Sequence, residues 1–244
     1  MKYRSIAPAL GSLILVNRSH PLQDFARPEL TAPDPAYPHI LMERRAALLL
    51  AACIRDAGAL GQIIPVSGWR SHEEQQAIWD ETMIKEGETF TRQYVALPGC
   101  SEHESGLAID LAKAAPEIDF IRPEFPYDGV CGVFRRLAPS YGFVERYRAD
   151  KQSFTGIAAE PWHFRYVGVP HALLMENKHL CLEEYIDLLR RQELTCTLEN
   201  GSRMRVRRLD AQDLPAWSRT SAGTYQLSPD NDGGIIVTQW EGAL

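Results

Sequence analysis

The chain has 244 residues, of which 45% are hydrophobic and 24% are charged. This composition is ordinary for a soluble globular protein, and the length is enough to bury a sizeable core without disulfide or metal staples. The formal net charge of -6 argues against a general nucleic-acid-binding surface, which would need a basic face.

The sequence pattern of the N-terminal half predicts that strands and helices alternate. Residues 13–17 and 63–67 are predicted strands, and the Ala- and Leu-rich residues 41–59 are predicted to form a buried helix. The proline-rich residues 27–38 indicate an extended loop. Ser71 and Glu74 have the spacing of a capping box, which predicts a helix from residue 71 to about residue 85. A loop is expected over residues 90–100.

The middle of the chain continues this mixed pattern. We expect a strand over residues 106–111 with Asp110 at its end, a helical segment over residues 130–141, and strands over residues 143–147 and 163–167. Residues 171–191 contain a helical pair with an apolar stripe. The middle of the chain therefore predicts an α+β fold.

The composition changes after Arg191. Residues 194–198 and 204–209 flank an Asn-Gly turn and predict a hairpin, and residues 224–227 and 234–240 predict another. We therefore divide the chain into a domain of residues 1–191 and a small β-rich appendage of residues 192–244.

Cysteine usage and hydropathy bear on the compartment. The five cysteines are odd in number, widely spaced and without a C-x-x-C pair, which favours free thiols in a reducing compartment. The apolar residues 6–16 are too short to span a membrane, and no small-residue cleavage site follows them. We expect a cytoplasmic protein without a membrane span.

Two short strings supply a candidate metal site: residues 101–110 (SEHESGLAID) and residues 160–163 (EPWH). They contain His103, Asp110 and His163, which are ligand types that zinc accepts, and three protein ligands leave a fourth tetrahedral position for water. The spacing of His103 and Asp110 fits a turn that enters a strand rather than the helical H-E-x-x-H arrangement. Cys100 is close by, but the site is complete without it. A zinc site of the catalytic type is therefore predicted.

Four further residues are candidates for the chemistry. Glu160 could act as general base on the bound water, or could be a surface carboxylate or a partner of a ligating histidine. Arg70 follows a strand and could stabilise an oxyanion, although a salt-bridged loop arginine is the more ordinary role. Ser101 and Gln75 could hydrogen-bond a substrate carboxylate or serve as local caps.

These strings together resemble the VanY-type zinc D-alanyl-D-alanine carboxypeptidases. The resemblance is carried by S-x-H-x-x-G-x-A-x-D at residues 101–110, EPWHFRYVG at 160–168, SGWRS at 67–71 with Gln75, and LVNRSHPL at 15–22. It covers roughly residues 12–190. It implies a small mixed α+β domain in which helices flank a central antiparallel sheet, as in hedgehog-like and D,D-peptidase domains, with zinc in a cleft.

The resemblance also implies roles. His103, Asp110 and His163 would bind zinc, Glu160 would be the catalytic base, and Arg70 would stabilise the oxyanion. The remaining implied substrate-binding residues are Ser101 and Gln75. A form without a membrane anchor, as expected here, resembles the VanXY group, which cleaves the free D-Ala-D-Ala dipeptide and the pentapeptide of peptidoglycan precursors and supports vancomycin-type resistance.

Alternative functions remain open at this point. An L,D-carboxypeptidase or an L-Ala-D-Glu endopeptidase would have the same fold and the same zinc chemistry. A zinc-stabilised binding module without catalysis is an alternative of another class, although Glu160 and Arg70 beside the ligands argue against it.

Overall fold

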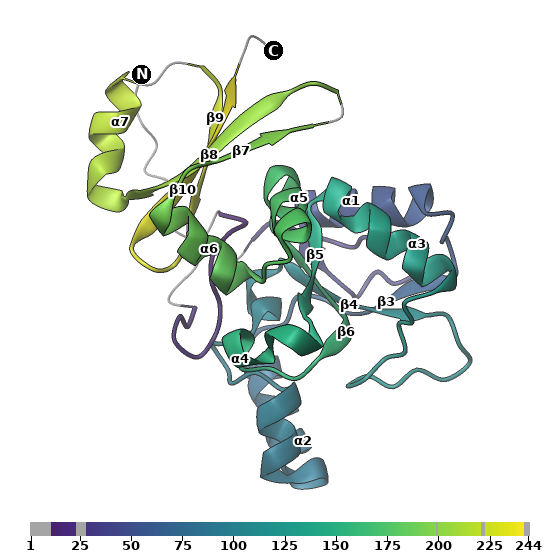
Figure 1. Ribbon diagram of the computed structural model, residues 1–244. Coiled ribbons are helices and arrows are strands. Elements are labelled where there is room, and N and C mark those ends of the chain that lie inside the picture. Colours follow the sequence, from purple (N-terminus) through teal and green to yellow (C-terminus); the bar gives the residue numbers. More distant parts are fainter. Residues whose placement is uncertain (1–10, 23–27, 199, 221–222, 242–244) are drawn as a thin grey trace.

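The computed structural model describes residues 11–22, 28–198, 200–220 and 223–241. Within these residues the strands form two four-stranded antiparallel sheets and one two-stranded sheet, with helices packed around them (Figure 1). The predicted α+β class, with a central antiparallel sheet and a C-terminal β region, is confirmed. The C-terminal sheet and α7 lie at one end of the molecule, and α2 projects from the other.

The central sheet has the strand order β3-β4-β6-β5. Its strands are β3 (Ile63–Ser67), β4 (Ala108–Lys113), β5 (Phe143–Tyr147) and β6 (Glu160–Tyr166). The predicted bounds of β3 and β5 are confirmed. β4 extends to Lys113, so Asp110 lies inside the strand rather than at its end, because β4 pairs with β3 as far as Ile63.

Helices on one side of the central sheet enclose the main core. The first of them, α1 (Arg44–Asp56), follows the short strands β1 (Leu30–Thr31) and β2 (Met42–Glu43). The Glu43 side chain caps it by accepting a hydrogen bond from the Ala46 backbone N–H. Leu50 of α1 shares this core with Ile109 of β4 and with Phe134 of α3 (Gly129–Leu137). A 3-10 turn, Ala138–Tyr141, completes the predicted helical segment.

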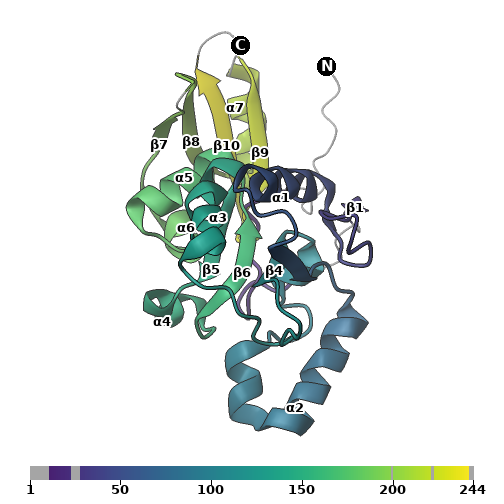
Figure 2. The same cartoon turned by 90° about the vertical axis from the view of Figure 1, so that its right-hand side faces the viewer.

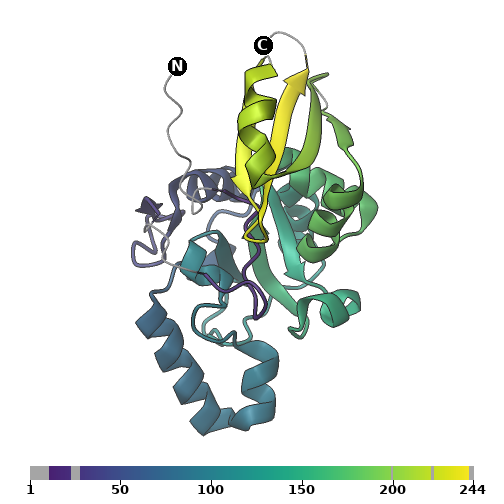
Figure 3. The same ribbon diagram turned by 90° about the vertical axis from the view of Figure 1, so that its left-hand side faces the viewer.

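The helix that was predicted to end near residue 85 continues as α2 (His72–Tyr94). Its capping box is present, with Ser71 and Glu74 as predicted. Gly87 has φ 82° and breaks the helix into two arms, which form the projecting hairpin in Figures 2 and 3. The prediction of a loop over residues 90–100 is therefore wrong for residues 90–94. Thr91 and an Arg92–Glu88 ion pair stabilise the second arm.

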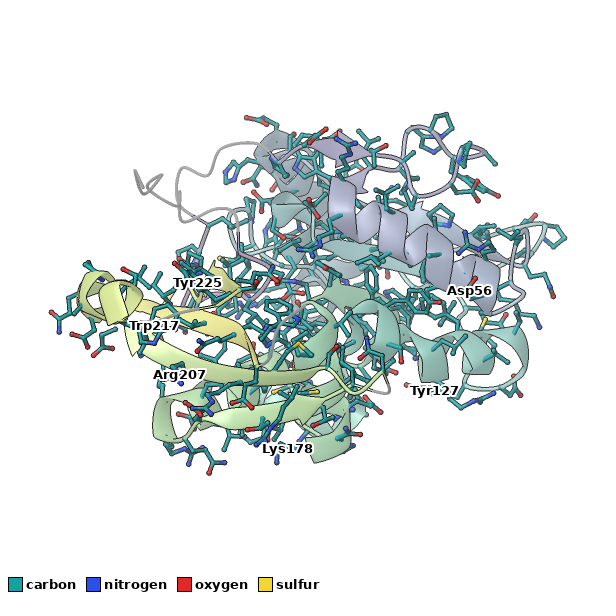
Figure 4. The ribbon with its side chains drawn as sticks, turned by 90° about the horizontal axis from the view of Figure 1, so that it is seen from above. Asp56, Tyr127, Lys178, Arg207, Trp217 and Tyr225 are labelled. Atoms are coloured by element: carbon teal, nitrogen blue, oxygen red, sulfur yellow. The ribbon has the colours of Figure 1, made fainter. Side chains whose placement is uncertain are left out.

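The C-terminal sheet has the order β7-β8-β10-β9 and contains both predicted hairpins. Its strands are β7 (Leu194–Thr197), β8 (Arg203–Asp210), β9 (Tyr225–Pro229) and β10 (Gly234–Glu241). The helix α7 (Leu214–Thr220) was not predicted. It packs on β9 through Trp217 and Tyr225, whose ring centroids are 5.1 Å apart (Figure 4).

This sheet shares a hydrophobic core with α5 (Val169–Lys178) and α6 (Leu182–Arg191). Leu194, Val206 and Ile236 contribute from the sheet. The short α4 (Gln152–Thr155) follows a 3-10 turn, Ala149–Lys151, on the opposite side of α6 from the sheet (Figure 1). The division at residue 191 stays a prediction.

The prediction of a strand over residues 13–17 is wrong. Residues 13–16 are buried, but Leu13 and Leu15 are held by isolated bonds to residues 228–231 rather than by a strand ladder. Leu13 N–H donates to Ser228 Oγ (2.9 Å), Leu15 N–H donates to the Asp230 carbonyl (3.0 Å), and Asn231 Nδ2 donates to the Leu15 carbonyl (2.9 Å).

The apolar segment at residues 6–16 lies only partly within the described residues, since residues 1–10 are outside them. None of the helices in the described part of the chain has the length and apolar character needed to cross a bilayer.

Candidate active site

His103, Asp110 and His163 lie together at the edge of a cleft beside the central sheet. One possible ligand atom from each falls within 4.8 Å of the others, and all three side chains are buried. His103 Nε2 is 3.2 Å from Asp110 Oδ2, and His163 Nδ1 is 3.0 Å from Asp110 Oδ1. The structure thus brings together the three residues that the sequence predicted as metal ligands.

The local fold explains this meeting. His103 lies in a 3-10 helix, Glu102–Ser105, which ends at Gly106 with φ 75°, a backbone conformation that glycine adopts without strain. The chain then enters β4, where Asp110 is directly opposite His163 of β6. The ligand pair is therefore set by the register of two neighbouring strands.

Glu160 reaches the same cluster because β6 is irregular. Residues three apart on a regular strand point to opposite faces. In the β5–β6 pairing, however, Glu145 pairs with Phe164 and Tyr147 pairs with Glu160, so two steps on β5 oppose four on β6. Pro161 lies in this bulge, where a residue without an N–H is tolerated. As a result, Glu160 Oε2 lies 3.7 Å from His163 Nδ1.

The polar contacts of His103 fit a cation. Its Nδ1 is 2.7 Å from the Gly68 carbonyl, which can only accept, so Nδ1 carries the proton. Burial, and then the nearby Arg70 charge, lowers the pKa of His103 to about 4, so the ring is neutral near pH 7. Its Nε2 lone pair therefore faces an Asp110 oxygen at 3.2 Å. A cation between them would turn this repulsion into two favourable contacts, and the N,O donor set suits zinc.

The neighbouring groups have shifted pKa values. Burial raises the pKa of Glu160 to about 8. Burial also opposes the charge on Asp110, but the contacts with His103 and His163 outweigh it and lower the pKa of Asp110. For His163, burial is outweighed by the hydrogen bond with Asp110 and by the nearby Glu102 carboxylate, which raise the pKa to about 9. A cleft in which some pKa values are raised and others are lowered is typical of an active site.

Arg70 lines the same cleft and is held in place by side chains. Its guanidinium donates to Ser67 Oγ (2.6 and 2.9 Å), to Gln75 Oε1 (3.2 Å) and to Asp110 Oδ2 (3.3 Å). Because Arg70 shares Asp110 with the histidines, its position is tied to the metal cluster. Burial lowers the pKa of Arg70, against the attraction of Asp110 and Glu160.

Gln75 and Ser101 also line this cleft. Both polar ends of Gln75 have protein partners, since Oε1 accepts from Arg70 and Nε2 donates to the Ala96 carbonyl (2.8 Å). Ser101 is buried, and its side chain makes no capping bond to the 3-10 helix that follows it. Gln75 therefore orients Arg70, whereas the Ser101 hydroxyl is not used as a cap.

Sequence reasoning missed several residues of the site. Tyr147, Trp162 and Phe120 line the cleft, and the Tyr147 ring centroid is 4.8 Å from that of His163. Glu102 is fully buried behind His163 and forms ion pairs with two arginines. Its place between Ser101 and His103 was the only signal in the sequence.

Comparisons with known proteins agree with this geometry. The family model for D-alanyl-D-alanine carboxypeptidases, VanY, matches residues 39–169. The bifunctional D-Ala-D-Ala dipeptidase and D-Ala-D-Ala carboxypeptidase VanXYC of Enterococcus gallinarum is 38% identical over 182 residues, which are 74% of this chain and 96% of the relative.

Two solved structures are also similar. The vancomycin resistance D,D-dipeptidase VanXYg, in complex with a D-Ala-D-Ala phosphinate analog, is 42% identical with a TM-score of 0.90 over 96% of each chain. That share includes most of the C-terminal sheet. A mutant of the D,D-pentapeptidase VanY from a VanB-type resistance cassette, in complex with Zn(II), is 33% identical with a TM-score of 0.60 over 72% of this chain and 98% of the other. The chain belongs to the VanY family of D-alanyl-D-alanine carboxypeptidases.

Proposed function

We propose that this protein is a zinc peptidase that hydrolyses the D-Ala-D-Ala bond of the free dipeptide, of the peptidoglycan precursor pentapeptide, or of both. Removal of these termini would support vancomycin-type resistance or precursor trimming. The observation that carries the proposal is the cluster of His103, Asp110 and His163 with the Glu160 carboxylate 3.7 Å from His163 Nδ1.

His103, Asp110 and His163 would hold the metal. When bound, the zinc ion supplies a Lewis acid that polarises the scissile carbonyl and makes an attacking water more acidic. Its positive charge would also lower the pKa of the buried Glu160 and so favour the ionised carboxylate. Glu160 then accepts a proton from the attacking water, as a general base does.

Glu160 also serves the second half of the reaction. The water oxygen bonds to the carbonyl carbon, the C–N bond breaks, and the proton held on Glu160 passes to the departing amine of D-alanine. Arg70 donates hydrogen bonds to the oxygen that becomes negative during attack. Its contacts with Ser67, Gln75 and Asp110 support this role, because a donor fixed in advance needs no reorganisation.

Ser101 and Gln75 are proposed to act on the substrate side. The Ser101 hydroxyl would donate to the carboxylate of the C-terminal D-residue. Gln75 would contribute through the orientation of Arg70, and its position in the cleft also allows a contact with the substrate. The aromatic side chains of Tyr147 and Trp162 would exclude water from the bond that is cleaved.

We further propose that the protein works in the cytoplasm. All five cysteines are free thiols, and four of them are buried. Free thiols are the usual state in a reducing compartment, where peptidoglycan precursors and the free dipeptide would be met as substrates.

The decisive experiment is product analysis with the zinc-loaded protein. Free D-Ala-D-Ala, a muramyl pentapeptide and an L,D-terminated tetrapeptide are each incubated with and without a chelator. Release of D-alanine from the first two, lost with chelator, is expected. Cleavage of the tetrapeptide alone would favour an L,D-carboxypeptidase, and cleavage between L-Ala and D-Glu would favour an endopeptidase. Bound zinc without cleavage of any stem peptide would favour a binding module.

A further inference from the structure

Two polar atoms face one another behind the metal cluster. Glu102 Oε2 and His163 Nε2 are 3.5 Å apart, and neither makes a hydrogen bond within the described residues. The side chains of Glu102 and His163 are 0% and 4% exposed. A buried polar atom that has left water without gaining a partner costs free energy, so this pair needs an explanation.

The surroundings of His163 Nδ1 indicate which ring nitrogen of His163 carries the proton. His163 Nδ1 faces Asp110 Oδ1 at 3.0 Å and Glu160 Oε2 at 3.7 Å, on the side of the metal cluster. A ligand nitrogen needs a free lone pair, so a neutral His163 that binds zinc through Nδ1 carries its proton on Nε2. Glu102 Oε2 is the acceptor that lies toward that proton.

We infer that Glu102 is a positioning residue whose Oε2 accepts the Nε2 proton of His163 and so fixes Nδ1 as the metal-binding nitrogen. A carboxylate commonly orients a ligating histidine in this way. The inference rests on the proposed zinc site but not on the substrate, because it concerns how the site binds metal.

The surroundings of Glu102 leave only one of its oxygens for this task. Glu102 Oε1 is 2.8 Å from both Arg146 Nε and Arg165 Nη1. Arg146 also donates to both oxygens of Glu183 on α6, at 2.9 and 2.6 Å. Two carboxylates and two guanidiniums balance in charge, and the arginines anchor Oε1 while Oε2 points to His163.

Replacing Glu102 by glutamine tests this arrangement. The arginines can only donate, so they would retain the amide oxygen of the Glu102→Gln variant, and the amide NH₂ would face His163 Nε2. A donor there favours the opposite tautomer, with the proton on Nδ1. The matched control is Glu183→Gln, which disturbs the same arginine from its other end and does not touch His163.

The readouts are zinc affinity, by competition with a chelator, and thermal unfolding of the metal-free proteins. We expect the Glu102→Gln variant to lose about 10- to 100-fold in zinc affinity, as is usual for such partners. The Glu183→Gln variant should keep wild-type zinc affinity, although it should lose about as much thermal stability as the Glu102→Gln variant. If both variants kept wild-type zinc affinity, or if both lost zinc affinity equally, the inference would be overturned. Failure of the wild-type protein to bind zinc would instead overturn the proposed function.

A measurement on the wild-type protein covers the case in which Glu102→Gln does not fold. With ¹⁵N-labelled histidine, long-range ¹H–¹⁵N spectra of the zinc-loaded protein distinguish the two ring nitrogens of His163. A protonated Nε2 and a metal-bound Nδ1 are expected. A metal-bound Nε2, or an Nε2 without a proton, would contradict the proposed role of Glu102.

Discussion

The two four-stranded sheets have the same antiparallel plan but place their charges differently. The central sheet buries Asp110, Glu160 and His163 along two neighbouring strands. The C-terminal sheet instead carries much of its charge near the surface, where Arg203 and Arg205 of β8 pair with Glu241 of β10. Arg207 of β8 is 27% exposed and pairs with Glu193.

The difference indicates what each sheet is for. Exposed ion pairs contribute little to stability, so those of the C-terminal sheet cost little to gain or lose. Buried charges are expensive unless they are paired or bind a metal. Metal binding and catalysis explain why the central sheet tolerates the cost of burying Asp110, Glu160 and His163.

The Glu160→Gln variant should lose roughly 10²- to 10⁴-fold in kcat/KM, because the amide cannot take a proton from water. Zinc content should be unchanged, since Glu160 lies outside the three-residue ligand cluster. The measurements are D-alanine release and metal analysis. Glu241→Gln is the control from the C-terminal sheet and should keep full turnover. Near-wild-type activity of a zinc-loaded Glu160→Gln variant would rule out its role as base.

Two arginines that contact buried aspartates, Arg70 in the loop after β3 and Arg208 of β8, provide the second comparison. Arg70 contacts buried Asp110, and Arg208 contacts buried Asp230 with an Nε–Oδ2 distance of 2.6 Å. Arg70→Lys should lower kcat/KM by about 10²- to 10³-fold, because a lysine cannot reproduce a fixed donor to the oxyanion. Arg208→Lys should lower the melting temperature and leave kcat/KM unchanged. Comparable losses of activity in both variants would show that the two sheets are not functionally distinct.

The features that could be predicted from the sequence are those that depend on patterns of neighbouring residues. β3 and β5 have their predicted bounds, and the hairpin β7–β8 follows from an Asn-Gly turn between alternating segments. The cluster of His103, Asp110 and His163 was also predictable, because its members lie within two short strings. These signals need no knowledge of distant parts of the chain.

Long-range pairing explains what was missed. The bulge that brings Glu160 beside His163 depends on the register of β6 against β5, which residue types alone do not fix. Glu102 finds its partners at Arg146 and Arg165, far along the chain. Residues 13–17 were predicted to form a strand, but Leu13 and Leu15 bond to the Ser228 side chain and to Asp230 and Asn231 rather than forming a backbone ladder.

The core of the C-terminal sheet gives the third prediction. Ile236 is 0% exposed and shares a core with Ile186 and Leu189 of α6. Ile236→Ala should cost about 2–5 kcal/mol of unfolding free energy, with unchanged kcat/KM well below the melting temperature. Unfolding followed by circular dichroism and by loss of activity should give one coincident transition. Two separate transitions would show that residues 192–244 unfold independently of the peptidase domain.

A buried histidine away from the metal cluster gives the smallest effect. His171 Nδ1 lies 2.9 Å from Tyr185 Oη, and its Nε2 lies 3.0 Å from Thr238 Oγ1 of β10. Burial lowers the pKa of His171 from 6.5 to about 3. The unfolded chain therefore binds a proton more readily below pH 6.5, so this contribution to stability is present above pH 6.5 and is lost as the pH falls toward 3. The loss is about 1.4 kcal/mol for each pH unit.

The His171→Gln variant should remove this part of the acid sensitivity, because an amide still bonds both hydroxyl groups but does not titrate. Unfolding free energies of wild type and variant are compared at pH 7 and pH 5, with excess chelator so that His103 and His163 contribute equally to both. The wild-type protein should lose more stability on acidification than the variant. Equal losses would mean that His171 is not held neutral in the fold, and that the contacts joining α5, α6 and β10 tolerate a charge as the metal cluster does.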